Sequence, residues 1–281
     1  MEKKVSENFD IQKILNTSKN IRKKILMMAM EAGSSSAHIG GALSIVDIMA
    51  TLFFGIMNID KNDPLNEDRD RFILSKGHAC LAYYASLSEL NYISDDELKT
   101  FEKNDTNLPG HPVMNKKLGI EFSTGSLGMG LSLGIGVALS ATKKKKNFNV
   151  YIILGDGECN EGSVWEAAMA APNFKLSNLH VIIDRNNFQQ TGTNSEIMDL
   201  RKLEDKWKSF GWYTQEVDGH DINKLYKNFS ELKKIDQPKA IIANTIKGKG
   251  FLKFENDNKW HHSVLTKSLY EEAIEEINSN K

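Results

Sequence analysis

The sequence has few cysteines and almost no net charge. Cys80 and Cys159 are the only two among 281 residues and form no C-x-x-C pair, which excludes a disulfide framework and a zinc or thiol-exchange motif of that type. Lys and Arg number 36, Asp and Glu number 37, and no stretch interleaves many basic residues with aromatic ones. Because nucleic acid is recognised by such basic surfaces, we expect no nucleic-acid partner.

Long apolar runs are also missing. The first residues are charged and amphipathic, without the apolar core of a secretion signal. The most apolar stretch, 127–139, is too short to span a bilayer and is crowded with Gly and Ser. We therefore expect a cytoplasmic protein without a membrane partner.

The composition itself, 40% hydrophobic and 26% charged, is typical of a globular protein. Apolar residues recur at helical spacing in 21–32 and 45–56, which predicts that the first 60 residues are mainly helical. The segment 33–41 between these helices is polar and rich in glycine, and we expect it to be a loop outside the core.

Short runs rich in β-forming residues then alternate with helical patterns; they are 71–75, 150–154, 180–184, 213–217 and 240–246. Continuous apolar strands separated by helices predict an α/β fold, a doubly wound and mostly parallel sheet with helices on both faces. No repeat or linker divides the chain, so residues 1–281 are expected to form a single domain. At this length, additional burial against a partner subunit is a reasonable expectation.

Polar motifs follow two of these strands. Gly155-Asp156-Gly157 comes directly after one strand, and Asn186-Asn187 comes directly after the next. Ligands gather at the carboxyl ends of such strands, so the oxygens of Asp156 and Asn186 can converge on one cation, Mg²⁺ or Ca²⁺. Gly157 leaves backbone N–H groups bare beside that ion, and the next helix points its N-terminus there. This pattern predicts a metal-bridged diphosphate.

Eight motifs in the same order along about 12–277 give the chain a resemblance to the N-terminal, thiamine diphosphate-binding half of transketolases. The motifs are Ala37-His38-Ile39-Gly40-Gly41, Ser75-Lys76-Gly77-His78, Gly110-His111-Pro112, Ser123-Thr124-Gly125-Ser126-Leu127-Gly128, Gly155-Asp156-Gly157-Glu158, Asp184-Arg185-Asn186-Asn187-Phe188, Lys247-Gly248-Lys249-Gly250 and Trp260-His261. Single-chain transketolases are more than twice as long, so the chain resembles the separate N-terminal subunit of a split enzyme.

The resemblance implies a role for each matching residue. Asp156, Asn186 and the Phe188 carbonyl would hold the metal. The cofactor-binding residues would be His78, Gly125, Ser126, Leu127, Gly157, Glu158, Asn186 and His261, with Gly125 and Leu127 along the aminopyrimidine and the bend of the cofactor. The catalytic residues would be His38, His111 and His261, which line the substrate channel, and Glu161, which joins a carboxylate network across the subunit interface.

The physical chemistry of the cofactor agrees with these roles. Thiamine diphosphate supplies the carbanion and the electron sink, so the protein has to bind, orient and handle protons. Imidazoles suit that work near neutral pH, because they donate to one oxygen and accept from another. His180 and His220 lie at a strand start and in a turn, where a structural role is the favoured interpretation.

Three neighbouring signals have simpler interpretations. The glycines at 128, 130, 134 and 136 lack the G-x-G-x-x-G spacing and favour close helix packing, at a subunit interface, over nucleotide contact. Cys159 has no histidine base within reach in the sequence, which disfavours nucleophilic catalysis. Lys247 and Lys249 follow a strand between glycines and could contact a phosphate or face solvent.

The chain departs from the family pattern at four positions. Ala37 and His262 stand where glycine is usual, Val113 stands where an acid is common, and Gln190 occupies a position that is usually apolar. These changes cluster around the expected substrate channel, while the metal and diphosphate residues are intact. The resemblance therefore predicts the cofactor and leaves the sugars open.

One group that the proposed chemistry needs is not among the residues that carry the resemblance. The resemblance implies that ylid formation needs a glutamate from a pyrimidine-binding domain. We expect that domain on another chain, a C-terminal subunit, with two copies of each subunit in the assembly. The leading hypothesis is transfer of a two-carbon ketol unit from a ketose or ketose phosphate to an aldose. The alternatives are another thiamine diphosphate reaction, such as a decarboxylase or 1-deoxyxylulose-phosphate synthase, and a non-catalytic cofactor-binding subunit.

Overall fold

The computed structural model describes residues 11–279. The strands are β1 (Arg71–Leu74), β2 (Val150–Gly155), β3 (Leu179–Arg185), β4 (Tyr213–Asp218) and β5 (Lys239–Asn244). The helices are α1 (Ile11–Glu31), α2 (Ile39–Leu43), α3 (Val46–Thr51), α4 (Cys80–Glu89), α5 (Asp95–Leu98), α6 (Met129–Lys143), α7 (Gly162–Asn173), α8 (Asn194–Ile197), α9 (Leu203–Ser209), α10 (Ile222–Leu232) and α11 (Lys267–Ser279). Short 3₁₀ turns cover Gly33–Ser35, Gly77–Ala79, Lys116–Leu118, Gly157–Asn160 and Asn258–His261, and α3 continues into a π-helical turn, Leu52–Ile56.

The five strands form one parallel sheet in the order β1-β2-β3-β5-β4. All five strand predictions are confirmed, as is the parallel α/β fold class. The register pairs Gly155 with Asp184 and Arg185 with Asn244, so β2, β3 and β5 end side by side. The loops that carry the polar motifs therefore leave the sheet at one edge.

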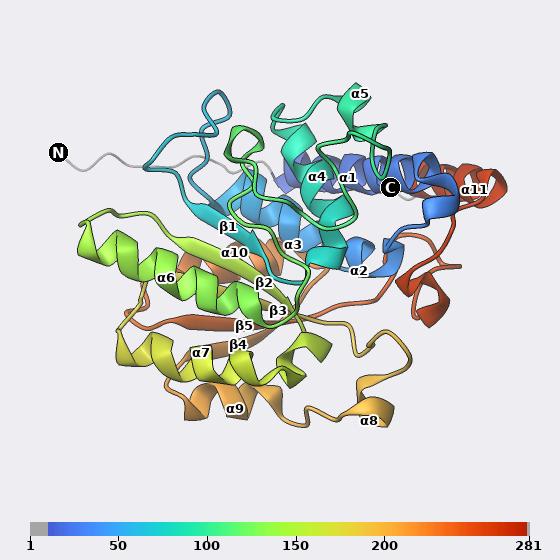
Figure 1. Ribbon diagram of the computed structural model, residues 1–281. Coiled ribbons are helices and arrows are strands. Elements are labelled where there is room, and N and C mark those ends of the chain that lie inside the picture. Colours follow the sequence, from blue (N-terminus) through green and yellow to red (C-terminus); the bar gives the residue numbers. More distant parts are fainter. Residues whose placement is uncertain (1–10, 280–281) are drawn as a thin grey trace.

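Helices cover both faces of the sheet (Figure 1), which explains why the strands read as continuous apolar runs. Along β2, Ile152 packs with α6, α7 and α9 on one face, whereas Ile153 packs with α1, α3 and α10 on the other. Both side chains are fully buried. No helix within 11–279 is long and apolar enough to cross a membrane.

The glycines of α6 allow this helix to approach the sheet. A Cβ on Gly134 would lie 2.1 Å from Cδ1 of Ile152, and one on Gly130 would lie 2.4 Å from the Ser75 side chain. The close packing predicted for these glycines is confirmed, but at both positions it is against the chain's own sheet and not at a subunit interface. Gly136, by contrast, has no atom within 4 Å of an added Cβ and faces outward.

The expectation that 33–41 lies outside the core is wrong for its second half. Ala37, Ile39, Gly40 and Gly41 are buried, and α2 begins at Ile39. Small residues are needed here because a Cβ on Gly40 would come 3.0 Å from the Trp260 carbonyl oxygen. The glycines that suggested a loop instead allow close packing.

His180 and His220 have structural roles, as predicted. His180 is 2% exposed and stacks on Tyr151, with 4.7 Å between ring centroids. His220 accepts a hydrogen bond from the Ile246 N–H at Nε2, 2.8 Å, so its Nδ1 carries the proton and donates to Asp47 at 2.9 Å. The helical prediction for the first part of the chain is also confirmed for the described residues.

Candidate active site

The site begins at the ends of β2 and β3. Asp156, directly after β2, is 1% exposed. Its Oδ1 accepts a hydrogen bond from the Gly157 N–H at 2.8 Å, and its Oδ2 accepts one from the Asn187 N–H at 2.6 Å. The sequence motifs at the two strand ends are thus bonded to each other. Burial, followed by the nearby Asp184 carboxylate, raises the pKa of Asp156 to about 6.

Asn186 is oriented by a buried ion pair beneath it. Its Nδ2 donates to Asp184 Oδ2 at 2.8 Å, and Lys76 Nζ lies 2.5 Å from the same oxygen. Asp184 also accepts hydrogen bonds from Ser44 and Thr245, and Lys76 donates to the Gly41 carbonyl oxygen at 2.9 Å. Burial alone would raise the pKa of Asp184, but Lys76 and these hydrogen bonds hold it below its usual value.

Glu158 joins three loops of the site. Its Oε1 accepts hydrogen bonds from the Ser75 hydroxyl and the Gly128 N–H, and its Oε2 accepts one from the Gly155 N–H at 3.0 Å. Burial raises the pKa of this carboxyl, although the hydrogen bonds oppose the shift. Glu158 therefore holds the end of β1, the end of β2 and the start of α6 together.

Four of the predicted histidine positions converge above these strand ends. His38 lies at the centre, with ring centroids 5.4 Å from His78, 5.7 Å from His111 and 5.4 Å from His261. Burial, followed by the neighbouring histidines, lowers the pKa of His38 to about 3, and burial with Lys247 lowers that of His261 to about 4. Burial also lowers the pKa of His78. These three rings are therefore neutral at pH 7 and able both to donate and to accept.

Lys247 faces this cluster, whereas Lys249 does not. Lys247 is 2% exposed, and its Nζ lies 2.6 Å from Asn258 Oδ1 and 3.1 Å from His261 Nδ1. Burial, followed by Lys76, lowers the pKa of Lys247 to about 8. Lys249 instead pairs with Glu255 at 3.2 Å. Of the two interpretations left open by the sequence, exposure to solvent is therefore wrong for Lys247.

These groups line one cavity of 370 Å³, the main cavity. Every predicted site residue except Ser126, which is exposed, belongs to its lining. The predicted residues in the lining are His38, His78, His111, Gly125, Leu127, Asp156, Gly157, Glu158, Glu161, Asn186, Phe188 and His261. Residues from distant parts of the sequence therefore meet as the motifs predicted.

The donors in the main cavity fit a divalent metal with a diphosphate. Asp156 is a buried carboxylate that accepts hydrogen bonds from two backbone N–H groups and forms no ion pair among the described residues, so a hard cation beside it would be favourable. Two positions in the lining of the main cavity also require glycine. Gly125 has φ +141°, and a Cβ there would lie 2.9 Å from Cδ2 of His111. A Cβ on Gly157 would lie 2.8 Å from Cγ of Gln189.

A smaller cavity of 80 Å³, the side cavity, shares His38 and His111 with the main cavity. Two of the positions that depart from the family pattern, Ala37 and His262, line it, and Gln190 lines the main cavity. Val113 lines neither and is 54% exposed. Three of the four departures thus lie at the expected substrate channel.

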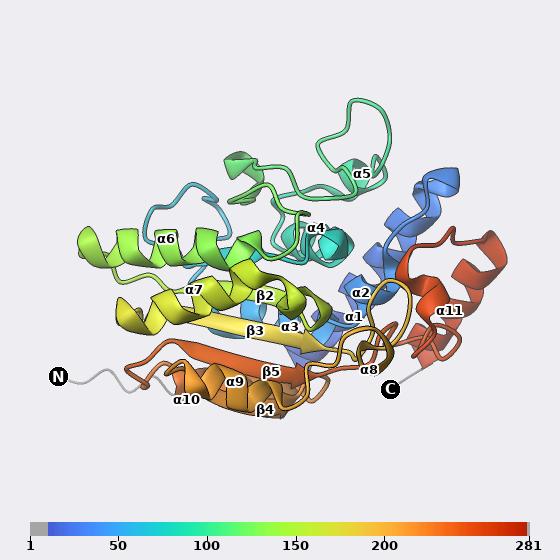
Figure 2. The same cartoon turned by 60° about the horizontal axis from the view of Figure 1, so that its bottom comes forward.

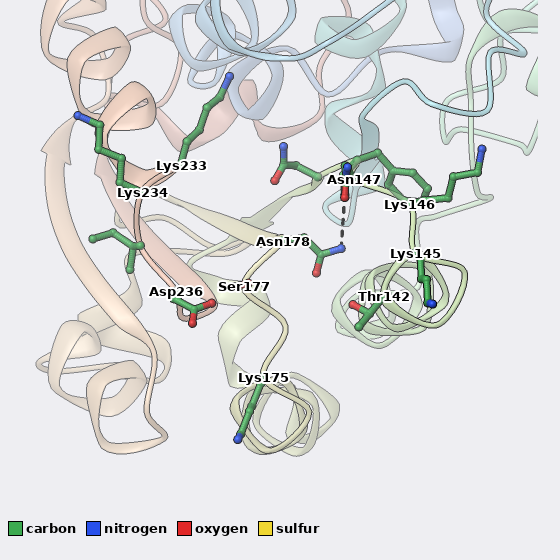
Figure 3. Close-up of a pocket in the computed structure, with 13 residues that line it drawn as sticks. Thr142, Lys145, Lys146, Asn147, Lys175, Ser177, Asn178, Lys233, Lys234 and Asp236 are labelled. Carbon is green, nitrogen blue, oxygen red and sulfur yellow. Dashed lines mark hydrogen bonds between the residues drawn. The ribbon is translucent and has the colours of Figure 1, made fainter. Parts of the chain in front are cut away.

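A larger cavity of 510 Å³ lies at the opposite edge of the sheet (Figure 3). It is lined by Lys145, Lys146, Lys175, Lys233 and Lys234. Figure 3 shows these side chains spreading apart instead of converging on one point. Helices α6, α7 and α10 end just before them, and cations are favourable at helix C-termini. These lysines are therefore explained by helix ends and give no sign of a ligand site.

Sequence reasoning missed the Lys76–Asp184 pair. Both residues belong to motifs noted above, but the motifs assigned neither of them a role. The available signal was a charge inside an apolar strand, Asp184, and another just beyond the end of an apolar strand, Lys76, because a charge is rarely buried without a partner.

Comparisons with known proteins agree with this geometry. The model of the transketolase thiamine diphosphate-binding domain family matches residues 16–279. One of the subunits of an apulose-4-phosphate transketolase from Actinobacillus succinogenes is 38% identical over 270 residues, which cover 96% of this chain and 98% of the relative. A subunit of a 6-deoxy-6-sulfo-D-fructose transketolase from Clostridium sp. is 40% identical over 241 residues, covering 85% of this chain and 88% of the relative.

Solved structures give the same result. The transketolase of Leishmania mexicana superimposes with a TM-score of 0.87 at 27% identity, covering 94% of this chain and 41% of that one. The chain thus spans about two fifths of that transketolase chain and nearly the full length of the relative from Actinobacillus succinogenes.

Proposed function

Because the chain belongs to the family of transketolase thiamine diphosphate-binding domains, we propose that it is the cofactor-binding subunit of a split transketolase. Together with a partner subunit it transfers a two-carbon ketol unit from a ketose or ketose phosphate to an aldose. The observation that carries this proposal is the main cavity, in which the metal, diphosphate and imidazole groups lie together. The names of the full-length relatives, which designate single subunits of transketolases, support the split arrangement.

Thiamine diphosphate, when bound, supplies the carbanion and the electron sink for the reaction. Asp156, Asn186 and the Phe188 carbonyl would hold Mg²⁺ or Ca²⁺, and the metal would bridge to the diphosphate. His78 and the backbone of Gly157 also line the main cavity. Lys247 lines it too, and its buried ammonium group would pair with a phosphate oxygen. The chain therefore contributes the anchoring of the cofactor.

The chain also handles protons at the substrate. His38, His111 and His261 would donate hydrogen bonds to sugar oxygens and accept them from hydroxyls. Neutral rings suit both tasks, and the low pKa values of His38 and His261 keep those two rings neutral. Three imidazoles fit a polyhydroxylated ketose better than pyruvate, which disfavours the decarboxylase and synthase alternatives.

The non-catalytic alternative conflicts with the intact site. A subunit that only binds cofactor or partner would not need three histidines beside the diphosphate groups. Their convergence around His38 favours catalysis.

The partner would supply the glutamate that activates the cofactor. We infer that it docks on the outer face of α6 and on Glu161, which lines the main cavity at the start of α7. Helices α6 and α7 lie side by side (Figures 1 and 2), with Met129 at 50% and Met169 at 54% exposure.

We propose two copies of each subunit, since closed two-fold symmetry is the commonest arrangement. Two buried free thiols agree with a cytoplasmic location.

A substitution on this face tests the docking surface. Gly136→Arg should leave the isolated chain folded, because open space surrounds the position and arginine is a better helix former than glycine. The arginine should prevent the close approach of the partner and weaken the association at least about tenfold. Analytical ultracentrifugation with the partner would measure this, with the exposed Asn223→Arg on α10 as the matched control. Equal association by both variants would place the interface elsewhere.

Two histidine substitutions separate anchoring from channel roles. His78→Ala should weaken thiamine diphosphate binding by about one to two orders of magnitude, the effect of losing one hydrogen bond to a charged group. His111→Ala should mainly lower kcat and acceptor selectivity, with cofactor affinity little changed. Calorimetry and steady-state kinetics of the reconstituted complex would give both results. The same kinetic signature for the two variants would contradict the division.

A further inference from the structure

The side cavity contains polar groups that the proposed mechanism does not use. Ser36, Glu102 and His262 line it, next to the channel residues His38 and His111. Ser36, His262 and Glu102 come from three separate segments of the chain.

His262 is held in place by the backbone beside it. Ala37 and Ser263 form an antiparallel bridge, with both N–H···O distances 3.0 Å, which sets His262 beside His38. The two ring centroids are 4.3 Å apart. Both ring nitrogens of His262 lie 3.1 to 3.2 Å from the Ser36 hydroxyl oxygen. Because that hydroxyl donates to the Ser35 carbonyl oxygen at 2.5 Å, it is left to accept from the ring.

Ser36 has an unusual backbone conformation at this point. Its φ is +60° and its ψ is 175°, a region that is populated almost only by glycine. A serine in this conformation is held there by the structure around it, and such residues cluster at functional sites. The strain lies in the wall of the side cavity.

The carboxylate of Glu102, in the lining of the side cavity, accepts no hydrogen bond from the described residues. It is partly buried, and within 11–279 its side chain makes no hydrogen bond or ion pair. The carboxylate lies against bare backbone, since a Cβ on Gly110 would be 2.0 Å from Oε1. Both oxygens of this partly buried carboxylate are free to accept, so a ligand hydroxyl that enters the side cavity finds an acceptor there.

We propose that the side cavity binds an uncharged, hydroxylated end of the substrate sugar, and that Glu102 and His262 are specificity-determining residues. This inference rests on the proposed function. A volume of 80 Å³ accommodates two or three groups the size of water, at about 30 Å³ each. The Glu102 carboxylate accepts a hydrogen bond from one sugar hydroxyl, and the His262 ring nitrogen that does not donate to Ser36 accepts one from another, whereas a phosphate or sulfonate would be repelled by Glu102.

The test compares two acceptors in the complex of this chain with its partner, in the presence of Mg²⁺ and thiamine diphosphate. D-erythrose has two more hydroxylated carbons than glycolaldehyde, which is too short to reach from the reacting centre into the side cavity. In Glu102→Gln and His262→Ala, kcat/KM for D-erythrose should fall about tenfold or more, while that for glycolaldehyde changes less than about twofold. Cofactor affinity should not change in either variant.

Asp105→Asn is the matched control, because it neutralises an exposed carboxylate on the same loop outside the cavity. Equal losses with both acceptors, or no loss with D-erythrose, would overturn the inference while the proposed function stands. If the unmodified complex turned over neither acceptor, the proposed function would fail and this inference would fail with it.

Discussion

Asp156→Ala should abolish the metal-dependent binding of thiamine diphosphate and leave the chain folded. In the proposed site, the substitution would remove an oxygen ligand from a hard cation without removing any apolar contact of the core. Because we propose that the metal connects the protein to the diphosphate, we expect affinity to fall about 100-fold or more. Calorimetric titration with cofactor in the presence of Mg²⁺ would measure the loss. Asn186→Ala should behave in the same way.

The matched control is Asp205→Ala, because Asp205 is an exposed carboxylate on α9, away from the main cavity. It should bind the cofactor like the unmodified chain. Unchanged affinity in Asp156→Ala or Asn186→Ala would contradict the metal assignment. A far-ultraviolet circular dichroism spectrum of each variant distinguishes loss of binding from loss of fold.

Lys76→Met should lower the free energy of unfolding by about 3 to 5 kcal/mol. Lys76 is 1% exposed and Asp184 is fully buried, so removing the ammonium group leaves a buried carboxylate without its opposite charge. The remaining partners, the hydroxyls of Ser44 and Thr245 and the Asn186 amide, carry no charge. Urea denaturation of the isolated chain would measure the difference.

An exposed ion pair provides the comparison for Lys76. Lys99 pairs with Asp96 at 2.8 Å, with 50% and 92% of the two side chains exposed. Lys99→Met should change the free energy of unfolding by less than about 1 kcal/mol, because solvent screens such pairs. Similar values for the two variants would mean that the Lys76–Asp184 pair does not stabilise the fold as described.

The sheet was predictable from the sequence because its strands are buried on both faces. Val150 to Leu154 is an unbroken run of apolar residues, which leaves little choice of element. The polar motifs after β2 and β3 were equally clear, since parallel neighbouring strands end at the same edge. Asp156 and Asn186 could therefore be placed together from the sequence alone.

The rest of the site depends on contacts that no local pattern encodes. Lys76 and Asp184 are 108 residues apart, and only the fold shows that they form a pair. Lys247 looked equally suited to solvent, and its burial follows from the packing of the segment that carries His261 and Trp260. Glycines were the least informative residues, because the same residue type permits a turn, close packing against the sheet or an open surface.

We propose above that this chain provides one half of an active site and needs a partner subunit for the other half. The most direct test is a titration of donor-ketose cleavage against an added pyrimidine-binding subunit, with Mg²⁺ and thiamine diphosphate present throughout. We expect no ketol transfer by the purified chain alone, and activity that rises with the partner until the two chains are present in equal amounts. Robust turnover without the partner would contradict the account, because some carboxylate of this chain would then have to activate the cofactor.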